Sequence, residues 1–217
     1  MVTDLQRDLI QAAFRGLGQA ERTFSTLTRD TLHFSQAPEY LLTVNVAEHL
    51  GQVSTRYLTW LEFQLPLACS TPRPHVANPP GRRRRGGRCD IFLCQAATKA
   101  PRAAFEIKRD VLSLNAVKPD LERILWMLNG GVEGNTLQFG AVMFSTMAES
   151  VHGRHVIRKR LDTFRDRLRE WQRTLPGGRG KRLHIISGGV KTRPAGDHWA
   201  AVALVAERVD KRRLKAF

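Results

Sequence analysis

Two short apolar segments, residues 88–95 and 102–108, constrain the fold of this chain more than any other feature of its sequence. Both are rich in branched and aromatic residues, a composition typical of buried strands. Three charged residues interrupt them, namely Asp90 in the first segment and Glu106 and Lys108 in the second. A strand that carries charge into an apolar sheet needs a compensating partner, so these three residues are the first candidates for a functional site.

The pattern of the second segment separates its charged side chains from its apolar ones. Because side chains alternate along a strand, Glu106 and Lys108 should lie on one face and Phe105 and Ile107 on the other. If the two segments pair as neighbours, Asp90 and Glu106 converge on one cation. Two carboxylates and the backbone carbonyl of Ile107 are oxygen ligands of the kind that Mg²⁺ or Mn²⁺ prefers. Lys108 would then orient water or stabilise charge on a phosphate.

The rest of the chain predicts a mixed α/β fold with a central sheet. Apolar periodicity and proline or glycine boundaries predict helices over residues 3–17, 38–50, 119–129 and 155–175. Strands are expected over residues 57–67, 88–95, 102–108, 136–144, 183–186 and 199–206. A polar stretch, residues 21–35, is expected to separate the first two helices.

With these residues in place, the chain resembles the PD-(D/E)xK nuclease family, whose fold is restriction-endonuclease-like. Residues 38–147 follow the αβββαβ order of that core, in a mixed central sheet flanked by helices. Asp90 matches the metal-binding acid of the second core strand, and Glu106 with Lys108 matches the E-x-K motif. The proline that usually precedes the aspartate is absent, and Cys89 stands in its place.

The resemblance also implies a domain division and a further acid. Residues 1–37 form an N-terminal helical extension, and residues 38–217 form the nuclease domain with a basic C-terminal helix and extra strands. Many such nucleases carry a catalytic glutamate on the first core helix. We expect Glu48 in that role, with Glu39 and Glu62 as alternatives.

The charge of the chain points to nucleic acid. Of the net charge of +15, residues 151–217 supply +12, with 18 Lys and Arg against 6 Asp and Glu. Such a field attracts phosphate backbones, although it also suits an anionic membrane or simple solubility. Arg82, Arg83, Arg84, Arg85, Lys118, Arg123, Arg158 and Lys159 are the predicted nucleic-acid contacts. The four consecutive arginines are equally typical of a solvated charge run, and Arg123 of an ion pair with Asp120 or Glu122.

These features together predict a Mg²⁺- or Mn²⁺-dependent endodeoxyribonuclease that acts on double-stranded DNA, and that forms a homodimer as many such enzymes do. The first twenty residues lack a signal-peptide pattern and no apolar run spans a bilayer, so we expect a cytoplasmic protein. The three cysteines suggest neither a disulfide framework nor zinc. The alternatives are a non-catalytic nucleic-acid-binding protein on the same fold and a protein that recognises an acidic partner.

Overall fold

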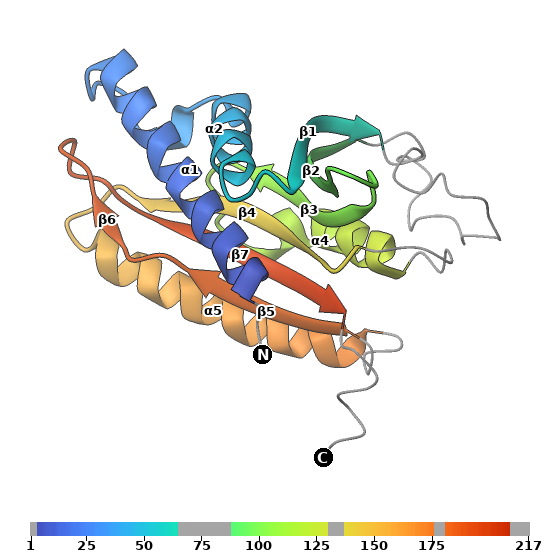
Figure 1. Cartoon of the computed structure of the whole chain (residues 1–217). Helices are drawn as coiled ribbons and strands as arrows, with labels where there is room; N and C mark the ends of the chain where they lie inside the picture. The colour runs from blue at the N-terminus through green and yellow to red at the C-terminus, as the bar shows by residue number, and fades with distance from the viewer. Residues whose placement is uncertain (1–3, 65–87, 130–136, 176–180, 209–217) are drawn as a thin grey trace.

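A computed structural model of the chain describes residues 4–64, 88–129, 137–175 and 181–208 (Figure 1). It has a mixed α/β architecture, in which a central sheet lies between two pairs of helices. The fold class predicted from the sequence is therefore confirmed at this level. None of the helices in the described parts of the chain is long and apolar enough to cross a membrane.

Among the described residues, the sheet has seven strands in the spatial order β1-β2-β3-β4-β7-β5, with the short β6 also paired to β7. They are β1 (Tyr57–Gln64), β2 (Arg88–Gln95), β3 (Pro101–Lys108), β4 (Phe139–Ala148), β5 (Lys181–Ser187), β6 (Lys191–Thr192) and β7 (His198–Arg208). The pairing of β3 with β4 is parallel, and every other pairing is antiparallel. The two segments that carry Asp90 and Glu106 are thus neighbours in the sheet, which is the condition set for their convergence.

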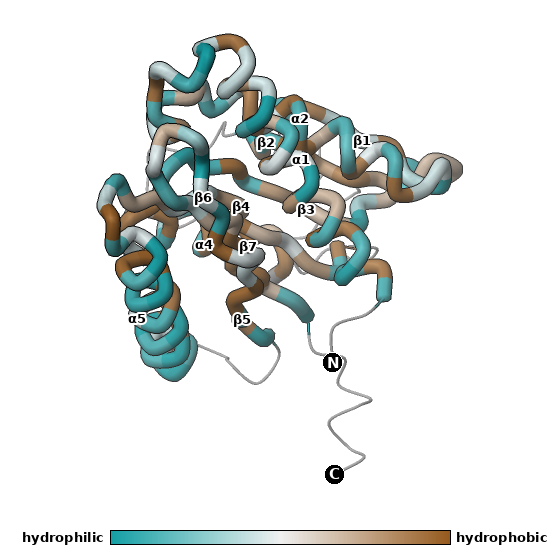
Figure 2. Tube along the Cα trace, turned by 90° about the vertical axis from the view of Figure 1, so that its left-hand side faces the viewer, coloured by the Kyte–Doolittle hydropathy of each residue, from teal (hydrophilic) through white to brown (hydrophobic). Residues whose placement is uncertain are grey.

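In the described parts of the chain, four α-helices cover the two faces of the sheet. They are α1 (Asp4–Thr28), α2 (Glu39–Gly51), α4 (Leu114–Asn129) and α5 (Gly153–Thr174), and a 3₁₀ turn, η1 (Phe34–Gln36), precedes α2. The helices α1 and α2 share one apolar cluster with the sheet, and α4 and α5 share the other, so each pair lies on its own face (Figure 1). Figure 2 shows that α5 is largely hydrophilic on its outer side.

The alternation predicted for β3 positions the candidate site. Phe105 and Ile107 are buried in the cluster formed with α1 and α2, whereas Ala104 belongs to the cluster formed with α4 and α5. Glu106 and Lys108 share the face of Ala104, because side chains two residues apart point to the same side of a strand. The carboxylate of Glu106 therefore faces α4, whereas Lys108 stands at the end of β3, where its long side chain reaches the start of α2.

The first helix is longer than the sequence predicts. We expected residues 21–35 to form a polar connection, but α1 continues to Thr28, so this prediction is wrong for residues 21–28. Ala20 and Phe24 are buried in the core, which stabilises the extra turns. Gly16 is the point of closest approach, since a Cβ there would lie 2.5 Å from the Cα of Val46 on α2. The two helices therefore cross closely at Gly16.

The helix after β3 begins earlier than its proline suggests. The predicted start was Pro119, but α4 begins at Leu114 and contains that proline near its first turn. A proline at the sixth position of the helix lacks the N–H that would donate to the carbonyl of Asn115, so α4 forms at the cost of one backbone hydrogen bond. Leu114 and Val117 are buried in the core, and this packing holds the additional turn.

Candidate active site

Asp90 and Glu106 lie beside each other at one end of the sheet. The regular pairing of β2 with β3 begins at Ile91, opposite Phe105, so the preceding Asp90 reaches the level of Glu106. Asp90 Oδ2 accepts a hydrogen bond of 2.7 Å from the backbone N–H of Ile107. The two acids that the sequence selected therefore come from adjacent strands and meet at the same place.

Glu106 is completely buried, with an exposed fraction of 0%. Its carboxylate faces α4, where Arg123 Nη2 lies 2.5 Å from Glu106 Oε2. The same guanidinium nitrogen donates a hydrogen bond of 3.0 Å to Asp120 Oδ1. Glu106 Oε1 has no hydrogen-bond partner among the residues that the structure describes. One oxygen of this carboxylate thus contacts an arginine, and the other is buried without a donor.

The burial of Glu106 changes its acidity. Burial raises the pKa of Glu106 to about 8, because a carboxylate loses its hydration there; Asp90 and Asp120 add to this rise, and Arg123 opposes it. The thiol of Cys89 is also buried, and burial together with the charges of Glu106 and Asp90 raises its pKa well above the usual value. Strong shifts of this kind mark functional sites as well as structural ion-pair networks.

Lys108 extends from the end of β3 towards the start of α2. Its ammonium Nζ lies 3.3 Å from Glu39 Oε1, and the side chain remains 26% exposed. Burial lowers the pKa of Lys108, but Asp120, Glu39 and the other nearby carboxylates outweigh that effect, so its pKa is raised. The lysine is therefore positively charged at neutral pH and still reaches solvent.

The structure brings Glu39 to the site and not Glu48. Glu39 Oε2 accepts a hydrogen bond of 3.3 Å from the backbone N–H of Arg109, in addition to its contact with Lys108. Glu48 is exposed more than two turns further along α2. Glu62, the other alternative, falls opposite Asp90 in the register of β1, but its carboxylate forms a 3.8 Å ion pair with Arg88.

The predicted nucleic-acid contacts are scattered over the molecule. Arg82 to Arg85 lie outside the described residues. Lys118 is positioned over the ring of Trp171, 5.5 Å from its centre, and so links α4 to α5. Arg158 and Lys159 are exposed on α5. Arg123 points inward to Glu106 with 13% of its side chain exposed, and its predicted pairing with Asp120 is present.

The carboxylates of Asp90 and Glu106 fit a small divalent cation, although two protein ligands are a small number for a metal site. Among residues 4–64, 88–129, 137–175 and 181–208, no group of three or more His, Cys, Asp and Glu side chains could hold a metal ion. Mg²⁺, however, commonly binds to one or two carboxylates and keeps several waters. The buried Oε1 of Glu106, which lacks a donor, and the neighbouring carboxylate of Asp90 match that requirement. A cation at this position would compete with Arg123 for Glu106.

Sequence reasoning missed Arg109 in this cluster and named Asp120 only as an alternative partner of Arg123. Arg109 anchors the end of β3 by donating from Nη1 to the carbonyl oxygen of Ala37 at 3.2 Å. Asp120 is largely buried, and its charge acts on both Glu106 and Lys108. The spacing of three between Asp120 and Arg123 was a signal for their pairing, whereas nothing in the sequence links Arg109 to Ala37.

Comparisons of the chain with protein-family models, curated proteins and solved structures give no match. The resemblance to PD-(D/E)xK nucleases therefore stays a prediction that rests on the residues described above.

Proposed function

We propose that this chain is a metal-dependent nuclease that hydrolyses phosphodiester bonds in DNA, on a restriction-endonuclease-like core. The observation that carries the proposal is the convergence of Asp90, Glu106 and Lys108 at one end of two paired strands. The order α2, β1, β2, β3, α4, β4, with β4 parallel to β3, supports it because this is the order of the expected core.

Each residue has a role that follows from its position. Asp90 and Glu106, with the carbonyl of Ile107, would hold Mg²⁺ or Mn²⁺. A bound divalent cation supplies charge neutralisation at a phosphate and makes water more acidic. Lys108 presents a charged ammonium with three donors to an oxygen of the phosphate or to the attacking water. Glu39 accepts from Lys108 and from the backbone of Arg109, so it fixes the direction of the lysine.

The direct test is nicking of supercoiled plasmid by the purified full chain with Mg²⁺, Mn²⁺ or chelator. Asp90→Asn, Glu106→Gln and Lys108→Met should each lower the rate by about a hundredfold or more, as the loss of electrostatic stabilisation does in other enzymes. Asp162→Asn is the matched control, because this acid lies on α5 and pairs with Arg165 on the outer surface. Nicking that persists in chelator, or equally in all four variants, would contradict the proposal.

A second function is favoured by one observation. Arg123 already neutralises part of the charge of Glu106, which is what a structural ion pair does in a chain that holds no metal. The alternative is a nucleic-acid-binding protein on the same fold without catalysis. It predicts salt-sensitive DNA binding, no nicking with either metal, and no Mn²⁺ binding by calorimetry.

A further inference from the structure

Four exposed cations gather where α1, β6 and α5 meet, away from the candidate active site. Lys191 Nζ and Arg22 Nη1 both approach Gly18, at 3.3 and 3.6 Å from the position that a Cβ there would take. Arg154 donates from Nε and Nη2 to Thr192 Oγ1, at 3.4 and 3.2 Å, so α5 is joined to β6. Arg158 follows one turn later on the same flank of α5. We call these residues, Arg22, Arg154, Arg158 and Lys191, the β6 basic surface.

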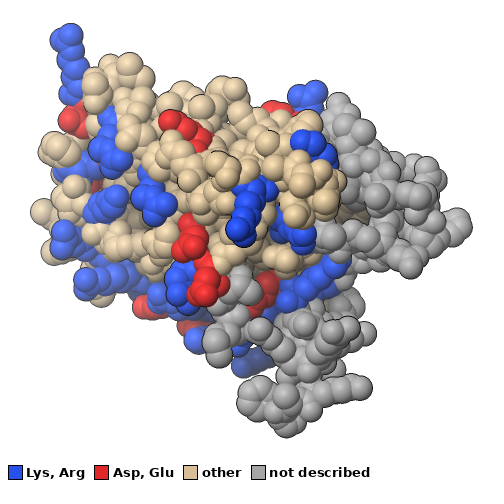
Figure 3. All heavy atoms as spheres, in the orientation of Figure 1, with Lys and Arg blue, Asp and Glu red and all other residues tan. Residues whose placement is uncertain are grey.

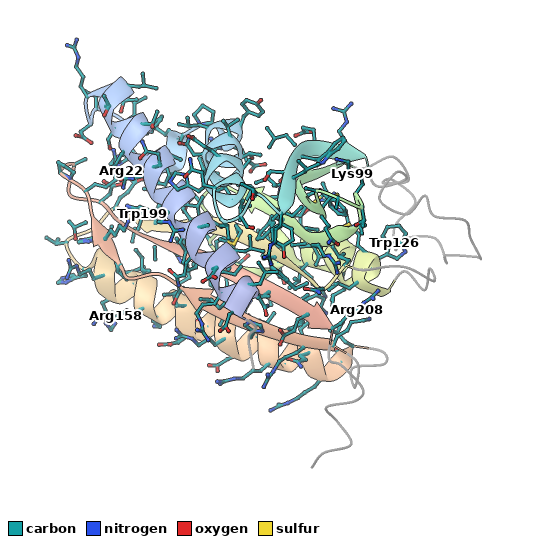
Figure 4. All side chains as sticks on the ribbon, viewed as in Figure 1. Arg22, Lys99, Trp126, Arg158, Trp199 and Arg208 are labelled. Carbon is teal, nitrogen blue, oxygen red and sulfur yellow. The ribbon has the colours of Figure 1, made fainter. Side chains whose placement is uncertain are left out.

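The cations of the β6 basic surface are not matched by carboxylates. Within the described part of the chain, none of the four forms an ion pair with Asp or Glu. Figure 3 shows Lys and Arg atoms gathered on this side of the molecule, and Figure 4 labels Arg22 and Arg158 at the same end. Like charges one helical turn apart repel each other, so Arg154 and Arg158 are unfavourable for α5 in the absence of an anion.

The carboxylates nearest to this surface face inward. Arg193, which is buried, contacts Glu21 at 3.0 Å, Asp30 at 3.1 Å and Asp197 at 3.2 Å. It also donates to the carbonyl oxygen of Leu32 at 3.2 Å. Three acids around one arginine carry a net negative charge, so this buried group does not attract an anion. The attraction comes from the exposed cations of the β6 basic surface alone. These acids are held by Arg193 and do not neutralise the surface arginines by direct contact.

The β6 basic surface and the candidate active site lie at the same end of the sheet. Thr192 pairs with His198, His198 pairs with Ala148, and β4 runs parallel to β3, which ends at Lys108. Neighbouring strands are about 4.8 Å apart and each residue advances about 3.4 Å, so the two places are roughly 20 Å from each other. A duplex rises about 3.4 Å per base pair, so this separation is roughly six base pairs.

From this placement we infer that the β6 basic surface binds the phosphate backbone of duplex DNA about six base pairs from the bond presented to Lys108. The inference rests on the proposed function for its substrate, and it adds where that substrate is held. Exposed guanidinium and ammonium groups donate hydrogen bonds to phosphate oxygens. Such contacts position a duplex without reading its bases.

The test measures binding in chelator, so that cleavage does not enter. Binding of a labelled 24-base-pair duplex is followed by fluorescence anisotropy over a series of salt concentrations. The double variant Arg154→Gln/Arg158→Gln should lose about tenfold in affinity, and the slope of log K against log salt should fall by roughly 1.8, which corresponds to two phosphate contacts. The double variant Lys191→Gln/Arg22→Gln should show the same loss of affinity and the same fall in slope.

The same helix supplies the matched control. Arg165→Gln/Arg169→Gln removes equal charge from α5, but these arginines pair with Asp162 at 2.5 Å and Asp166 at 3.3 Å. Its affinity should stay within twofold of the wild type, and its salt slope should not change. Equal losses in test and control variants would overturn the inference, because they would indicate net charge alone. Tighter binding to anionic lipid vesicles than to the duplex would overturn it also.

Failure of this inference and failure of the proposed function are distinguishable. A chain that binds DNA through the β6 basic surface but never nicks it contradicts only the nuclease proposal. A chain that nicks plasmid but whose affinity is insensitive to Arg154 and Arg158 contradicts only the inference. Circular dichroism and thermal unfolding of each variant establish that it is folded before binding is compared.

Discussion

The guanidinium of Arg123 on α4 lies 2.5 Å from the carboxylate of Glu106 on β3, inside the molecule. The carboxylate that the sequence selects as a metal ligand is therefore in contact with a cation that the chain itself provides. A metal ion and Arg123 compete for the carboxylate of Glu106. Metal binding there requires Arg123 either to move away or to share the carboxylate with the metal.

This competition gives the first prediction. Arg123→Gln should raise the affinity for Mn²⁺ by about tenfold, equivalent to about 1.4 kcal/mol, because the competing cation is removed. Without metal the variant should be less stable than the wild type by about 3 kcal/mol, since the largely buried Asp120 loses the guanidinium that pairs with it and with Glu106. Isothermal titration calorimetry and urea unfolding measure the two effects. Arg123→Lys keeps the charge and should give a smaller increase, and an affinity that falls in both variants would contradict the competition.

A second prediction concerns pH. The pKa of Glu106 is raised from 4.5 to about 8, so the folded chain retains a proton that the unfolded chain has released. The resulting stabilisation is complete below pH 4.5 and is lost as the pH rises towards 8. One such group contributes a slope of at most about 1.4 kcal/mol per pH unit. Urea unfolding between pH 5 and 8 should give a shallower decline for Glu106→Gln than for the wild type, and parallel profiles would exclude this assignment.

A third prediction separates the candidate glutamates. Glu39→Gln removes the negative charge beside Lys108 and replaces one of the two oxygens that accept from Lys108 and from the backbone of Arg109, so plasmid nicking should fall by about tenfold. Glu48→Gln changes an exposed side chain on α2 and should alter the rate by less than about twofold. Initial rates of plasmid nicking with Mg²⁺ and Mn²⁺ show which of the two glutamates contributes to catalysis. The reverse result would restore Glu48 as the residue that completes the site.

A fourth prediction tests the crossing of α1 and α2. Helix propensity alone predicts that Gly16→Ala stabilises the chain by about 1 kcal/mol. The close approach predicts the opposite sign, a loss of about 1–3 kcal/mol, because a Cβ would lie 2.5 Å from the Cα of Val46. Gly189→Ala is the control, since no atom lies within 4 Å of the corresponding Cβ position. Urea unfolding distinguishes the two, and a stabilised Gly16→Ala would show that the helices separate easily.

The sequence by itself determined six of the seven strands in the described residues, all but the short β6, and most of the candidate site. Residues 88–95 and 101–108 are joined by a short connection, so their antiparallel pairing is a local consequence of chain geometry. The alternation of side chains then places Glu106 and Lys108 on one face of β3. The pairing of the two strands brings Asp90 to their level, so no distant segment is needed for this prediction. These features follow from contacts between neighbouring elements, which composition and periodicity report directly.

Only the tertiary structure decided which distant groups join them. Glu39 reaches Lys108 across 69 residues, whereas Glu48, on the same helix, faces solvent. Arg123 was expected either to contact nucleic acid or to form an ion pair within its helix, and it turns inward, because a buried carboxyl group needs a polar partner inside the protein. The length of α1 likewise depends on its packing against α2. Such choices depend on how helices dock on a sheet, and a one-dimensional pattern does not encode that docking explicitly.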